Sequence, residues 1–157
     1  MYPVKLHFDK VLRRIRKLLS NGHSAEALVT SVFTFEKLIK RSLRHAIVAR
    51  GFTVEQVSIL LDRKGFEELQ RMWEVFERDH KRLPEILGST WQNMPKAKTM
   101  RNHLVHGNKV YSLDDCKSYA RDVLTALEKL HEYVIDEYGA DPWTKRPRKR
   151  ATPPWKP

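Results

Sequence analysis

The chain has 157 residues, enough for one domain with its own core, and its 41% hydrophobic and 31% charged residues exclude a collagen-like or disordered protein. Lysine and arginine number 30 against 19 acidic residues, a formal net charge of +11. This excess favours phosphate-rich partners, because their binding releases condensed counterions.

No apolar run approaches the roughly 18 residues that a membrane span needs; the longest are residues 46–49 and 57–61. The N-terminal residues 1–5 lack the charged, apolar and small-residue regions of a signal peptide. The lone Cys116 cannot form an internal disulfide. We therefore expect a cytoplasmic protein with no membrane partner.

Two amphipathic helices are predicted in the first third of the chain. Apolar residues recur every three or four positions between residues 4 and 19, and Asn21-Gly22 ends this stripe. Ser24 can cap the next helix, whose apolar stripe continues to about residue 47 before Gly51 supplies a stop.

The middle of the chain predicts shorter helices. Thr53 and Gln56 form a capping-box pattern, and Gly65 interrupts the helical stripe that follows, which indicates two short helices or one broken helix. Pro84, Gly88 and the pair Ser89-Thr90 then mark a connection.

Two more helices complete the predicted fold. Pro95 is well placed to open a helix that runs to about His106, with Gly107 beyond its end. Ser112 starts a second capping box, and an apolar stripe leads from there to Gly139.

No segment alternates with a period of two for long enough to be a strand, and no repeat is present. The sequence thus predicts an all-α fold, an up-and-down bundle of four to five helices with a short broken helix. This helical domain is expected over residues 1–140. A disordered, proline-rich basic tail is expected over residues 141–157.

Arg101, Asn102 and His106 form an Arg-Asn-x-x-x-His motif at the end of a predicted helix. An arginine that keeps its charge and a histidine that titrates near neutrality suit phosphodiester cleavage when they share one site. The alternative is an exposed helix end, where both residue types favour the helix dipole by about 0.3–1 kcal/mol.

This motif resembles that of the HEPN family (higher eukaryotes and prokaryotes nucleotide-binding), whose active members are ribonucleases. The resemblance rests on the helix pattern from residue 6 to residue 138 and on Arg101, Asn102 and His106, with Leu104, Val105 and Gly107 around them. It implies a four- or five-helix bundle that dimerises with its two motif helices face to face. The composite ribonuclease site between them works without metal.

Helix geometry agrees with a dimer. At about 100° per residue, Arg101 and His106 project about 140° apart, whereas Asn102 and His106 share a face. One helix therefore does not easily aim both catalytic groups at one phosphate, and a twofold partner can supply the second group.

The resemblance implies a role for each motif residue. His106 would take the proton of a ribose 2′-hydroxyl or give one to the leaving 5′-oxygen, and Arg101 would stabilise the charge on the phosphorane oxygens. Asn102 would orient His106 or the phosphate. The expected products carry 2′,3′-cyclic phosphate and 5′-hydroxyl ends.

Two further residues are candidates for supporting roles. His103 lies three positions before His106 and could carry a second proton. Glu36 resembles an acidic residue that family members place against the motif, where it could hold Arg101 in a bidentate pair. Glu36 fits equally well as a solvated charge or as the partner of a nearby lysine.

The predicted tail contains a cluster of positive charges next to Trp143: Lys145, Arg146, Arg148, Lys149 and Arg150. It is interpreted first as an arm that holds RNA. The flanking Trp143 and Trp155 could stack on bases, or they could simply accompany a flexible tail. A sorting signal and a peptide that docks on a partner are the alternatives.

The sequence therefore leads to a hypothesis of a metal-independent endoribonuclease, a homodimer that cleaves RNA as a toxin or an antiviral defence effector. It needs no cofactor, and an antitoxin or regulatory protein is a further expected partner. A noncatalytic HEPN module that binds RNA or a protein is the alternative, and so is an accessory subunit. No His, Cys or carboxylate spacing predicts a metal site.

Overall fold

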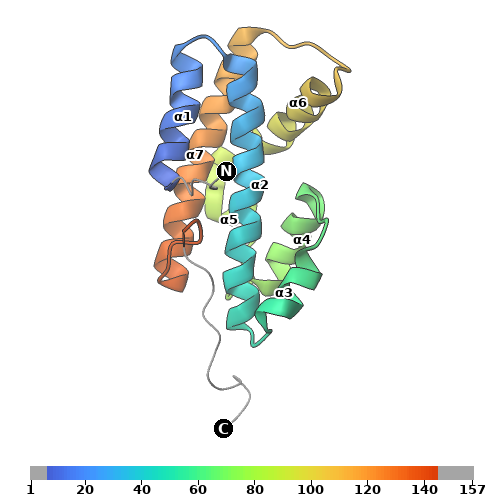
Figure 1. The fold of residues 1–157 in the computed structure, drawn as a ribbon, viewed down its shortest axis with the longest axis vertical. Coiled ribbons are helices and arrows are strands. Elements are labelled where there is room, and N and C mark those ends of the chain that lie inside the picture. Colours follow the sequence, from blue (N-terminus) through green and yellow to red (C-terminus); the bar gives the residue numbers. More distant parts are fainter. Residues whose placement is uncertain (1–6, 145–157) are drawn as a thin grey trace, which may run out of the picture. The chain divides into compact units, whose positions relative to one another are not determined.

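The computed structural model describes residues 7–144, and all regular structure within them is helical, which confirms the predicted all-α class. No helix in this part of the chain has both the length and the apolar character needed to cross a bilayer. The elements, labelled in Figure 1, are α1 (Phe8–Ser20), α2 (Ser24–Ala49), α3 (Val54–Leu61), α4 (Phe66–Phe76), α5 (Leu83–Leu87), the 3₁₀ helix η1 (Gly88–Trp91), α6 (Met94–His106) and α7 (Leu113–Tyr138).

The described residues form two compact units, where the sequence predicts one domain. The first unit contains residues 7–35 and 87–129, and the second contains residues 36–86 and 130–144. The two long helices, α2 and α7, each contribute their first part to the first unit and their last part to the second.

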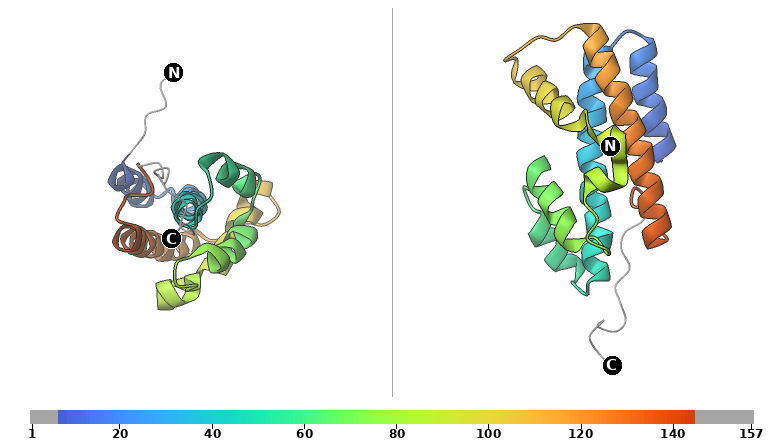
Figure 2. Two further views of the ribbon diagram at one scale, coloured as in Figure 1. Left: turned by 90° about the horizontal axis from the view of Figure 1, so that it is seen from below. Right: turned by 180° about the vertical axis from the view of Figure 1, so that it is seen from behind.

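Five helical segments build the described first unit: α1, the first part of α2, η1, α6 and the first part of α7. On α1 the predicted stripe is buried, with Ile15 fully covered and Phe8, Leu12 and Leu19 at most 8% exposed. Figures 1 and 2 show α1 and α6 on opposite sides of this part of α2. The two faces of the unit are therefore available for different tasks.

The second unit is organised around a buried carboxylate. Glu77, directly after α4, is only 1% exposed. Its side chain accepts hydrogen bonds from the backbone N–H groups of Asp79 (2.8 Å) and Lys81 (2.7 Å) and from the Tyr133 hydroxyl (2.6 Å). Burial, followed by this hydrogen bond to Glu77, raises the pKa of Tyr133. Glu77 thus fixes the turn after α4 against α7.

The connection predicted around Pro84 and Gly88 contains two short helical elements, α5 and η1. Pro84 lies in the first turn of α5, where its missing N–H has no helical acceptor to serve. Leu83 and Leu87 are fully buried. Tertiary burial of these two leucines explains why helix forms despite the turn-forming residues around them.

The sequence predicts a disordered tail from Asp141, but the described residues 141–144 are folded against the second unit. Trp143 is 8% exposed, and its ring lies under the guanidinium of Arg41, 4.5 Å from the ring centroid. Arg41 also donates a hydrogen bond to the Trp143 carbonyl. This burial under Arg41 does not favour base stacking by Trp143. The cationic run from Lys145 to Arg150 lies outside the described residues.

Asp141 holds this last folded segment in place. Its carboxylate accepts hydrogen bonds from the Trp143 backbone N–H at 2.8 Å and lies 2.9 Å from Nε2 of His131. Burial alone would raise the pKa of Asp141, but these two partners outweigh burial and lower it. The folded second unit thus extends to Thr144.

Candidate active site

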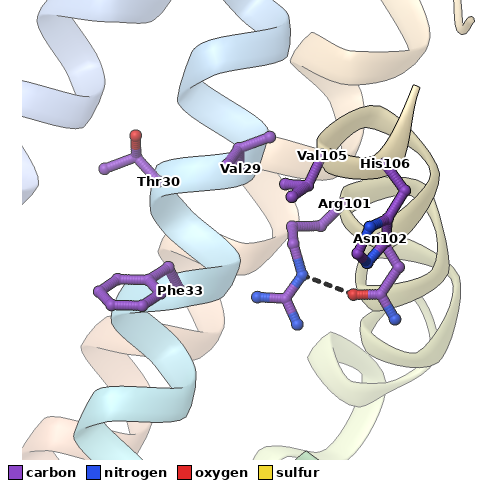
Figure 3. Close-up of a pocket in the computed structure, with 7 residues that line it drawn as sticks. All are labelled: Val29, Thr30, Phe33, Arg101, Asn102, Val105 and His106. Atoms are coloured by element: carbon purple, nitrogen blue, oxygen red, sulfur yellow. Dashed lines mark hydrogen bonds between the residues drawn. The ribbon is translucent and has the colours of Figure 1, made fainter.

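The three motif residues line one open pocket in the first unit. Arg101, Asn102 and His106 of α6 face the first part of α2 across a space of about 490 Å³ (Figure 3). The other lining residues, mostly apolar, are Val29, Thr30, Phe33 and Val105. The predicted catalytic residues are therefore brought together.

Local sequence signals position the motif at the end of α6, as predicted. Pro95 lies in the first turn, and Gly107 ends the helix with a φ of 68°, in the left-handed region that glycine adopts without strain. The Asn108 N–H then bonds to the His103 carbonyl at 3.0 Å. His106 is thus the last helical residue, and its exposed side chain lies where the backbone turns away.

Asn102 holds Arg101. The Nε of Arg101 donates a hydrogen bond of 2.8 Å to Oδ1 of Asn102, and Figure 3 shows the guanidinium in the space between α6 and α2. The sequence assigned Asn102 to His106 or to the phosphate, so this partner was not anticipated. Because the bond fixes Nε, it orients the plane of the guanidinium.

Arg101 and His106 reach the same pocket although helix geometry places them on different faces of α6. Their directions on the helix differ by about 140°, yet both side chains line the same pocket. Arginine is long enough to reach back over the face that Asn102 and His106 share. One copy of the chain therefore presents both groups to one opening.

The two histidines of α6 differ in their surroundings. Within residues 7–144 no hydrogen bond or ion pair engages the His106 imidazole, which is exposed. His103 instead has its Nδ1 2.7 Å from the Tyr111 hydroxyl, and the two rings are stacked. His103 does not line the pocket, so its environment does not favour the predicted proton-carrying role.

Glu36 lies on α2 in the second unit and is partly buried, whereas Arg101 belongs to the first unit. The predicted ion pair between them stays a prediction.

An apolar rim beside the motif was not predicted from the sequence. Phe33 is 60% exposed and Val105 is 58% exposed, and both line the pocket. Phe33 falls outside the buried stripe of α2 that contains Val32 and Phe35. A large aromatic residue out of phase with the stripe was the signal that could have revealed this rim.

Three carboxylates in the second unit approach one another, which no sequence spacing indicated. Oxygens of Glu77, Asp79 and Glu137 lie within 4.8 Å of each other. The Glu77 carboxylate already accepts three hydrogen bonds from protein donors. It therefore serves the fold, and these residues are not part of the candidate active site.

Comparisons with models of protein families, with curated proteins and with solved structures give no match to this chain. The function of the pocket is accordingly argued from its chemistry.

Proposed function

We propose that this protein is a metal-independent endoribonuclease of the HEPN type that acts as a homodimer. The observation that carries the proposal is the open pocket in which Arg101, Asn102 and an exposed His106 meet. A fixed guanidinium beside an accessible imidazole is the pair of groups that cleavage of a ribose phosphodiester requires.

The chemistry uses the 2′-hydroxyl of the RNA as the nucleophile. His106 takes the hydroxyl proton, the 2′-oxygen bonds to phosphorus, and the bond from phosphorus to the 5′-oxygen breaks. Arg101 stabilises the negative charge that gathers on the phosphorane oxygens, and Asn102 keeps the guanidinium oriented. The products end in a 2′,3′-cyclic phosphate and a 5′-hydroxyl.

The reaction also needs an acid that gives a proton to the leaving 5′-oxygen. Among the described residues, His106 is the one histidine that lines the pocket. A second copy related by a twofold axis supplies another imidazole. The neutral His106 of one copy then acts as the base, and the partner's His106, in its protonated form, acts as the acid. Dimerisation is thus part of the mechanism.

The apolar rim supports such a dimer. Phe33 and Val105 expose most of their side chains next to the motif. A second copy that covers this rim removes apolar surface from water and brings the two motif helices together. The same rim also supports the second candidate, a noncatalytic module that binds another protein through this face.

The biological role that we propose is that of a toxin or an antiviral defence effector that cuts RNA inside the cell, with an antitoxin or regulatory protein as a further partner. This role comes from the resemblance of the motif to HEPN ribonucleases.

The proposal is tested with purified protein and labelled RNA in excess EDTA. Cleavage is expected to survive the chelator and to be lost in Arg101→Ala and in His106→Ala. His103→Ala is the matched control, because it removes an imidazole from the same helix outside the pocket and is expected to retain cleavage. Circular dichroism checks that all three variants remain folded.

Cleavage that persists in both pocket variants would identify a contaminating nuclease and overturn the assignment. RNA binding without cleavage under any condition would instead favour the noncatalytic module.

A further inference from the structure

Helix α1 presents a second feature of the first unit, a row of cations. Lys10, Arg13, Arg14 and Lys17 follow the spacing i, i+3, i+4, i+7, which places them on one face of the helix. That face is opposite the buried stripe, and all four residues are exposed. The row therefore points into solvent.

The four cations have no counter-ions among the residues that the structure describes. Within residues 7–144 no ion pair or hydrogen bond engages any of their side chains. Like charges at three- and four-residue spacing repel each other and destabilise a helix. A polyanion would relieve this repulsion, and the release of its counterions would favour binding.

A cleft lies between the same helix, α1, and α7. It has a volume of about 310 Å³ and is lined by Arg16, Leu19 and Ser20 of α1 and by Lys117, Arg121 and Leu124 of α7. Leu19 and Leu124 are largely buried and form an apolar floor, whereas Lys117 and Arg121 bring positive charge to the edge. Arg16 is held by Glu128 at this cleft.

We propose that the α1 row and this cleft together form a cationic surface that binds single-stranded RNA through its phosphates. The inference rests on the proposed function and adds to it a substrate-holding surface. The row from Lys10 to Lys17 extends over about 10 Å, which matches about three nucleotides of a stacked strand. An unstacked base fits the apolar floor, whereas a paired base has no free face to offer it.

The cationic surface is separate from the pocket. In Figures 1 and 2, α1 and α6 lie on opposite sides of the first part of α2. RNA bound on α1 must therefore pass around the unit, or reach the second copy, to enter the pocket. The surface thus holds the substrate without touching the reacting phosphate.

An anionic membrane is a different partner for a basic amphipathic helix, and α1 is unsuited to it. Such helices insert their apolar face among the lipids. The apolar face of α1 is already buried, with Phe8, Leu12, Ile15 and Leu19 at most 8% exposed.

The test uses the full chain with His106→Ala, so that RNA is bound but not cut. A fluorescent single-stranded 20-mer is titrated at several salt concentrations with this protein and with a triple variant, Arg13→Gln, Arg14→Gln and Lys17→Gln. Binding is expected to weaken roughly tenfold, and the slope of log K against log salt to fall by about 2, because each lost phosphate contact removes about 0.7.

The control removes the same charge from exposed arginines of the second unit, with Arg44→Gln, Arg63→Gln and Arg71→Gln. It is expected to change affinity less than twofold. Equal weakening in both triple variants would mean that net charge alone drives binding, and it would overturn the proposed surface.

Three other results would also overturn the proposal. The triple variant of α1 could bind RNA as tightly as the parent, or the parent could bind a duplex more tightly than the single strand. The triple variant of α1 could also lose binding to phosphatidylserine vesicles while it still binds RNA. When the triple substitution of α1 is made in the protein that retains His106, the KM for RNA is expected to rise about tenfold, with little change in kcat. Absence of cleavage in the parent protein would contradict the nuclease while leaving the binding result valid, so the two failures are distinguishable.

Discussion

The two units of the molecule use charge in opposite ways. The described first unit carries twelve lysine and arginine residues against six acidic residues, a net charge of +6, whereas the described second unit carries eleven against thirteen, a net charge of −2. In the first unit, the cations of α1 and the motif residue His106 are exposed. In the second unit, Glu77 and Arg41 are tied into hydrogen bonds that hold the fold.

If the proposed function holds, the first unit meets the polyanion, whereas the second unit stabilises the structure. The first unit is cationic without the predicted basic tail. Variants in the two units should therefore fail in different assays.

The largest expected effect is on catalysis in the first unit. His106→Ala should lower the cleavage rate by roughly 10²- to 10⁴-fold, the usual contribution of a general acid–base residue. Its melting temperature should stay close to that of the parent, because the exposed imidazole has no partner within residues 7–144. Single-turnover cleavage and thermal melting measure the two quantities, and a large loss of stability with little loss of rate would reverse the assignment.

The next effect is on stability in the second unit. Glu77→Ala leaves two backbone N–H groups and the Tyr133 hydroxyl without their acceptor, so it should lower the free energy of unfolding by about 3 kcal/mol. Glu74→Ala, three residues earlier and exposed, should change it by less than about 0.5 kcal/mol. Urea denaturation measures both, and equal effects of the two substitutions would show that Glu77 does not organise the turn.

A smaller effect is expected at the end of the motif helix. Gly107→Ala forces an alanine into a left-handed conformation at a φ of 68°, which should cost about 1–2 kcal/mol although no atom blocks the added methyl group. Gly65→Ala meets open space without a positive φ, so it should cost less than Gly107→Ala, no more than the modest loss expected when alanine replaces glycine at the N-cap of α4. Thermal or urea unfolding of both variants compares them, and equal stability would mean that the turn after His106 relaxes without strain.

The smallest effect depends on pH. Because the pKa of Asp141 is lowered in the folded state, its carboxylate adds stability above its unfolded pKa of about 3.9 and loses it as the pH falls through the folded value. Asp141→Asn should lower stability at pH 7 by at most about 1 kcal/mol, since the group is partly exposed. This difference should shrink as urea denaturation is repeated toward pH 3, and a difference that grew instead would contradict the lowered pKa.

The sequence predicts those parts of the fold that depend on neighbouring residues. The buried stripe of α1 and the capping box at Thr53 are readable from local periodicity and side-chain hydrogen bonding, and both are confirmed. Burial of Trp143 is not readable, because it depends on Arg41, 102 positions away in the chain. The α5 helix was missed for the same reason, since the burial of its leucines outweighs the turn signal of Pro84 and Gly88.

The sequence predicts which residues form the candidate site, but it does not predict how their side chains are arranged. Arg101, Asn102 and His106 were found from their spacing, and they meet in one pocket. Their side-chain partners depend on rotamers, so the bond from Arg101 to Asn102 and the contact of His103 with Tyr111 could not be anticipated. The exposed Phe33 comes from a different helix and enters the site only through tertiary packing.

The central claim is that two copies share one site, each contributing its His106. The most direct test mixes the parent protein with His106→Ala in varying proportions, lets subunits exchange, and measures EDTA-resistant cleavage. If both imidazoles act on one phosphate, the rate falls with the square of the parent fraction, to about one quarter at equal amounts. A linear fall to one half would show that each copy cleaves alone and would contradict the shared site.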